Sequence, residues 1–111
     1  MVTQGRREQL VQELRTAERA RDLLTELERR LKEENRPDLD QQLTQLDRLA
    51  ESLPEGHNVR LLVESAVGSA RTRGARRAGS AASRSRSVVE GRISTLRGTI
   101  SRQDALSRLD T

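Results

Sequence analysis

The feature that most constrains the fold is a run of apolar residues at helical spacing near the start of the chain. Successive members are separated by four, three, seven, three and four positions, which places them on one face of a helix. No glycine or proline occurs between Arg6 and Arg36. The sequence therefore predicts a helix about 30 residues long. Its coiled-coil-like seam consists of Leu10, Leu14, Ala17, Leu24, Leu27 and Leu31.

A second amphipathic segment follows Pro37, which disfavours helical geometry in the residue before it. Asp38 is the predicted N-cap of this segment, with Gln41 as its capping-box partner. Two helices joined by a short turn predict an antiparallel hairpin over residues 1–56. The second apolar stripe consists of Leu39, Leu43, Leu46, Leu49 (or Ala50) and Leu53, and it ends at Pro54.

The two predicted helices differ in length. At 1.5 Å per residue the first is about 45 Å long and the second about 24 Å. The second helix therefore leaves about 20 Å of the leucine seam uncovered. An apolar stripe of this kind needs a partner, and the partner is either the remainder of the chain or another copy of it.

Residues 57–111 begin with a third helical pattern, for which Asn58 is the predicted N-cap and His57 a solvent-exposed turn residue. Residues 65–87 contain no acid and consist almost entirely of Ser, Ala, Arg and Gly. This composition is typical of a flexible basic linker. The alternative is a helix with a ridge of small residues at i+4 spacing, which allows close approach of another helix. The ridge consists of Ala66, Ala70, Gly74, Ala78 and Ala82.

An apolar stripe resumes after this segment, at Val88 or Val89, Ile93, Leu96 and Ile100. The predicted fold is therefore all-α. It has an elongated helical hairpin over residues 1–56 and a basic segment over residues 57–111, which is either a long helix rich in small residues or partly disordered. The predicted helix–helix interface consists of Leu10, Leu14, Leu24, Leu27, Leu31, Leu43, Leu46, Leu53, Ala66, Ala70, Gly74 and Ala78.

Charge is divided unevenly between the two predicted segments. Residues 1–56 hold 10 basic residues against 13 acidic ones, whereas residues 57–111 hold 11 arginines against 4 acids. We consider three roles for the arginine cluster of the second segment: contact with a polyanion, pairing with carboxylates of neighbouring subunits, or no role beyond solvation. The cluster consists of Arg71, Arg73, Arg76, Arg77, Arg84 and Arg86.

Several classes of function are disfavoured by composition. The chain has no cysteine, no aromatic residue and a single histidine, so we expect no catalytic site, no metal site and no cofactor. Its glycines match no phosphate-binding or dinucleotide-binding motif. The longest apolar run has three residues and the N-terminus is charged, so we expect neither a membrane span nor a secretory signal. We expect a protein of the cytoplasm or of the inside of a particle.

These features favour a non-enzymatic structural or adaptor component of a multi-subunit assembly, such as a virion or another particle. Its expected partners are further copies of the chain, other protein subunits, or both. The alternative is a small nucleoid-type DNA-binding protein, in which the hairpin dimerises and the arginine cluster contacts phosphates without reading sequence.

Overall fold

The computed structural model describes residues 2–32, 39–72 and 75–109. These ranges form four helices and no strand: α1 (Val2–Leu31), α2 (Leu39–Glu51), α3 (Asn58–Thr72) and α4 (Ala75–Leu109). The prediction of an all-α fold is confirmed. Residues 65–87, for which the sequence allowed either a flexible linker or a helix, are helical wherever the structure describes them, on α3 and at the start of α4.

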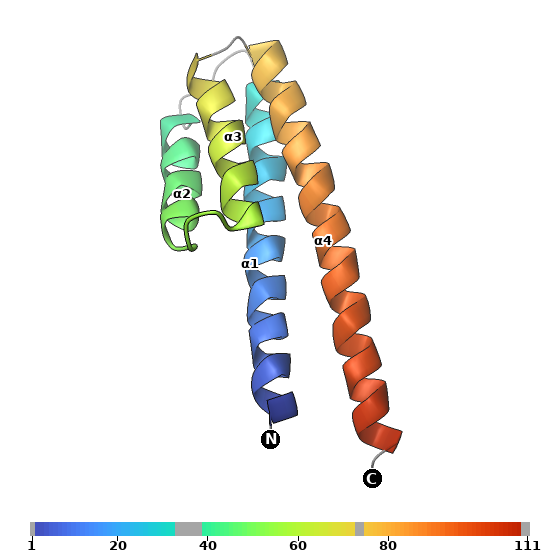
Figure 1. The fold of residues 1–111 in the computed structure, drawn as a ribbon. Coiled ribbons are helices and arrows are strands. Elements are labelled where there is room, and N and C mark those ends of the chain that lie inside the picture. Colours follow the sequence, from blue (N-terminus) through green and yellow to red (C-terminus); the bar gives the residue numbers. More distant parts are fainter. Residues whose placement is uncertain (1, 33–38, 73–74, 110–111) are drawn as a thin grey trace.

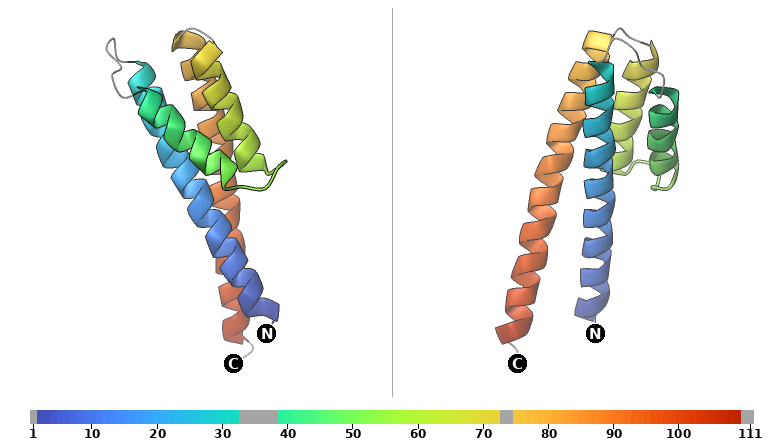
Figure 2. Two further views of the ribbon diagram at one scale, coloured as in Figure 1. Left: turned by 90° about the vertical axis from the view of Figure 1, so that its left-hand side faces the viewer. Right: turned by 180° about the vertical axis from the view of Figure 1, so that it is seen from behind.

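The four helices run alternately up and down (Figure 1). With 30 and 35 residues, α1 and α4 are about twice as long as α2 and α3, which have 13 and 15. All four helices therefore lie together at one end only. Beyond α2 and α3 the long helices continue toward the two termini (Figure 2), and the molecule measures 57 × 22 × 20 Å. We call the first half of α1 (residues 2–16) and the second half of α4 (residues 93–109) the arm.

One apolar core contains side chains from all four helices. Its largest fully buried members are Leu24 and Leu27 of α1, Leu46 of α2, Val63 of α3 and Val89 of α4. Residues of both predicted segments, 1–56 and 57–111, thus pack into the same core. Of the other predicted interface leucines, Leu31 and Leu43 are buried, and Leu10, Leu14 and Leu53 pack at the core's margin.

The seam of α1 that α2 cannot reach is covered by α4, so the chain itself supplies the missing partner. Among the described residues, four ion pairs join α1 to α4. The two at the ends of the contact, Arg7–Asp104 and Glu28–Arg86, run in opposite directions along the two helices, as expected for antiparallel packing. The pairs are Arg7–Asp104 (2.8 Å), Glu13–Arg92 (3.0 Å), Glu18–Arg97 (2.8 Å) and Glu28–Arg86.

The predicted ridge of small residues belongs to two helices rather than one. Ala66 on α3 and Ala78 and Ala82 on α4 are fully buried, and Ala70 packs beside them, whereas Gly74 lies outside the described residues. Because α3 and α4 are antiparallel neighbours (Figure 1), the small residues of α3 lie against the small residues of α4. These small side chains fill the contact between the two helices.

Two buried polar side chains tie the short helices to the long ones. The Gln42 amide on α2 donates a hydrogen bond to the Leu23 carbonyl oxygen on α1 (3.0 Å). The Ser85 hydroxyl on α4 donates to the Leu62 carbonyl oxygen on α3 (3.1 Å). Both side chains are 6% exposed or less, so each bond removes the cost of an unpaired polar group in the core.

The start of α3 differs from the prediction. His57 is half-buried rather than solvent-exposed, and its Nδ1 accepts a hydrogen bond from the backbone N–H of Val59 (3.1 Å). The His57 carbonyl oxygen also accepts the first helical bond, from Leu61 N–H. His57, and not Asn58, is therefore the N-cap. Gly56 precedes it with φ of 82°, a left-handed conformation that glycine adopts without strain.

We predict that Leu24→Asp unfolds the protein. The carboxylate would enter a fully buried position with no cation to pair with it, at a cost of about 4 kcal/mol or more. Circular dichroism should show a large loss of helix. Leu61→Asp is the control, because Leu61 is 54% exposed and the same change there should leave the helix content intact. Full helicity in the Leu24 variant would contradict the described core.

We also predict that His57→Ala lowers the free energy of unfolding by about 1 kcal/mol, because it removes the side-chain acceptor for the Val59 N–H. His57→Asn should restore most of this loss, since asparagine supplies a capping oxygen. Urea denaturation of the three proteins measures both effects. Equal stability of the Ala and Asn variants would show that the histidine does not act as a cap.

Candidate functional site

Of the four arginines in the predicted cluster whose side chains the structure describes, two form ion pairs within the chain. Arg71 on α3 pairs with Asp47 on α2 (2.5 Å), and Arg86 on α4 pairs with Glu28 on α1 and with Glu90 one turn along α4 (2.9 Å). Hydrogen bonds to these carboxylates raise the pKa of both guanidinium groups above the ordinary arginine value. The partners come largely from the acidic first half of the same chain, a source that the sequence hypotheses did not consider.

The other four members of the cluster fall into two groups. Arg77 and Arg84 are exposed on α4 and form no ion pair within the described part of the chain. The side chains of Arg73 and Arg76 lie outside the described residues. The structure therefore divides the predicted cluster, because its members point to different sides of the bundle.

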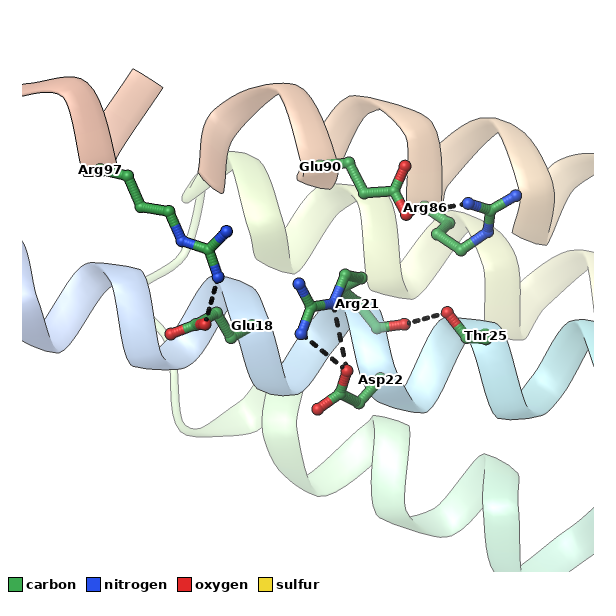
Figure 3. A network of polar contacts seen from close by, with 7 residues as sticks. All are labelled: Glu18, Arg21, Asp22, Thr25, Arg86, Glu90 and Arg97. Carbon is green, nitrogen blue, oxygen red and sulfur yellow. Dashed lines mark hydrogen bonds and ion pairs between the residues drawn. The ribbon is translucent and has the colours of Figure 1, made fainter. Parts of the chain in front are cut away.

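The paired arginines of α4 lie on the side that faces α1. Figure 3 shows Arg97 reaching across to Glu18 on α1 (2.8 Å), and Arg86 beside Glu90 on α4 itself. On α1, Arg21 pairs with its neighbour Asp22 (3.0 Å). These side chains are only partly covered, so each pair stabilises the fold little. The pairs that join α1 to α4 favour one register of the two long helices, since a shifted helix would lose several of them together.

A groove of about 570 Å³ lies between the end of α1 and the first part of α4. Leu31 is buried beside it, and two cations, Lys32 and Arg84, contribute to its walls. Because the α4 wall is built of small residues, the groove is wide and lined with hydroxyl groups. The lining residues are Glu28, Leu31, Lys32, Gly79, Ser80, Ser83, Arg84 and Ser87.

The arm carries a second unusual surface. It has two helices where the other end has four, and α2 and α3 do not extend over it (Figure 2). Leu106 and Leu109, near its tip, are 62% and 81% exposed. Nearby on α4, the side-chain oxygen Oε1 of Gln103 is buried and has no hydrogen-bond partner within the described part of the chain.

In residues 2–32, 39–72 and 75–109, no three His, Cys, Asp or Glu side chains gather closely enough to hold a metal ion. The one histidine is engaged as a helix cap. None of the described helices is long and apolar enough to span a membrane. No protein-family model, curated protein or solved structure matches this chain.

We predict that the pKa of Asp104 lies below the ordinary aspartate value. Arg7 donates a hydrogen bond to this carboxylate (2.8 Å) and attracts its negative charge. Because the folded-state pKa is depressed, the pair stabilises the arm above the unfolded pKa of about 3.9. That contribution is lost as the pH falls through the folded pKa.

An NMR titration of the Asp104 carboxyl carbon measures this pKa directly. In the Arg7→Gln variant the pKa should return toward the ordinary value, and 1 M NaCl should have the same effect by screening the pair. An Asp104 pKa that is the same in both proteins would show that the two helix ends do not meet in solution.

Proposed function

We propose that this protein is a non-enzymatic helical component of a multi-subunit assembly, and that the arm joins one copy to a second copy. The observation that carries the proposal is the unequal length of the helices. At one end α2 and α3 complete the packing of α1 and α4 into a four-helix bundle, and in the arm the corresponding positions are empty.

The arm contains apolar side chains that a two-helix pair covers only in part. Ile93 and Leu96 are buried between the two helices of the arm, whereas Leu10 and Leu14 of α1 and Ile100 of α4 are only half-buried. Toward the tip the exposed fraction rises further, at Leu106 and Leu109. A partner that covers Leu106 and Leu109 would remove apolar surface from water, which favours association.

A second copy is the partner that fits this surface most simply. Two arms packed side by side supply four helices, which is the number that closes the core at the other end of the molecule. Such a contact is isologous, with the same surface used on both copies, and two-fold dimers are the commonest soluble oligomers. The result would be a rod with a four-helix bundle at each end and a joint in the middle.

The molar mass of the protein in solution, measured by light scattering, tests the proposal. The monomer has a mass of 12.5 kDa, so a dimer should scatter as a particle of about 25 kDa in the absence of any other macromolecule. The double variant Leu106→Asp, Leu109→Asp should remain at the monomer mass, because it places charge in the proposed joint. The control is Leu61→Asp, which changes a comparably exposed leucine on α3, outside the arm.

Circular dichroism of the same samples separates loss of assembly from loss of folding. The arm variant should keep the helix of the four-helix end. A monomeric wild-type protein at concentrations up to about 1 mM would overturn the proposal. A dimer that persists in the arm variant but dissociates in the Leu61 variant would move the joint from the arm to α3.

A further inference from the structure

The arginines of α4 fall into two sets with different environments. Arg86, Arg92 and Arg97 face α1, and each pairs with a glutamate of that helix. A second set is exposed and forms no ion pair within the described part of the chain: Arg77, Arg84 and Arg102.

The three arginines of this second set lie along one line of the helix, which we call the outer arginine line. Arg84 and Arg102 are separated by 18 residues, which is five full helical turns, and Arg77 precedes Arg84 by about two turns. At 1.5 Å per residue the neighbouring members are about 10 Å and about 27 Å apart along the axis. The line is therefore about 37 Å long.

No acidic side chain of the described part of α4 interrupts this line. Its two acids, Glu90 and Asp104, are both engaged with arginines, namely Arg86 and Arg7. The outer side of α4 between the arginines carries mainly serine, threonine and glycine. Small side chains of this kind leave the backbone close to the surface, so an anionic chain can approach α4 closely.

Near one end the line meets the groove beside α1. Arg84 and Lys32 both line this groove, together with the hydroxyl-bearing Ser83 and Ser87. The Glu28 carboxylate in the same groove is engaged by Arg86 and its charge is offset. Two cations and several hydroxyl groups around one open groove form a suitable setting for a phosphate group.

We propose that the outer arginine line and Lys32 bind the phosphate backbone of double-stranded nucleic acid. A single phosphate could contact only one member of a line this long, whereas a duplex presents one phosphate per strand about every 3.4 Å along its axis. Single-strand binding by base stacking is disfavoured because the chain has no aromatic residue. Binding is independent of sequence, since the contacts are to phosphates.

The salt dependence of DNA binding tests this proposal. For a labelled 30-base-pair duplex, log K should fall with log salt at a slope of about −0.9 per phosphate contact. The three arginines and Lys32 of one copy therefore predict a slope of about −3.6 per protein copy. Two duplexes of unrelated sequence should give the same affinity and the same slope.

Two variants with the same net charge distinguish binding at the proposed site from binding that depends on net charge alone. The site variant carries Arg77→Gln, Arg84→Gln and Arg102→Gln. The control carries Arg15→Gln, Arg19→Gln and Arg48→Gln, which are exposed arginines of α1 and α2 without an ion pair among the described residues. Both variants lower the net charge from +4 to +1. The site variant should lose about three-quarters of the slope, and the control should keep most of it.

Equal losses in the two variants would overturn the proposal, because they would assign binding to net charge alone. No wild-type binding at 50 mM salt would also overturn it. Saturable binding of inorganic phosphate with no binding of the duplex would reduce the site to a single-phosphate groove. Because Arg102 lies in the arm, the double variant Arg77→Gln, Arg84→Gln keeps this test separate from the assembly proposal. It leaves the arm unchanged, so it should keep the dimer mass while it loses about half of the slope.

Discussion

The antiparallel packing of α1 against α4 is the interaction on which the rest of the structure depends. These helices lie far apart in sequence, yet together they form the full length of the molecule (Figure 1). The short helices α2 and α3 bury their apolar faces by packing onto this pair. Two hydrogen bonds join them to it, from Gln42 to the Leu23 carbonyl oxygen and from Ser85 to the Leu62 carbonyl oxygen. A chain without aromatic residues cannot concentrate its core in a few large side chains. It instead distributes burial along two long helices.

The same packing explains why charge is divided between the two halves of the sequence. Acids of α1 and arginines of α4 meet across the contact, so the acidic first half neutralises part of the basic second half. Because α4 is helical, only one side of it can meet α1. The arginines on the other side keep their charge, and the excess of positive charge in residues 57–111 is thereby concentrated on the outer side of the bundle.

The sequence predicted the all-α fold and many of the buried side chains, because leucine spacing reports directly which face of a helix is apolar. It did not predict which helices would pair over the greatest length. Periodicity identifies a buried face but not the helix that covers it. The helix that covers this part of α1 is α4, about 80 residues away in the sequence, as the Glu13–Arg92 pair shows. The start of α3 was misplaced by one residue, because histidine is an uncommon N-cap and asparagine stood beside it. For the arginine cluster, linear proximity was misleading, since Arg84 and Arg86 point to different sides of the same helix.

The glycines of α4 lower the intrinsic stability of this helix. A Cβ atom added at Gly91 or Gly98 would meet no other atom, so the packing of this chain does not require glycine at either position. Each glycine costs up to about 1 kcal/mol relative to alanine in a helix interior. The helical state of α4 around these glycines, just before the arm and within it, is therefore weak by itself. It depends on α1, through apolar contacts and partly exposed ion pairs. Anything that packs against the arm stabilises α4 as well as burying surface, so association and helix formation are thermodynamically linked there.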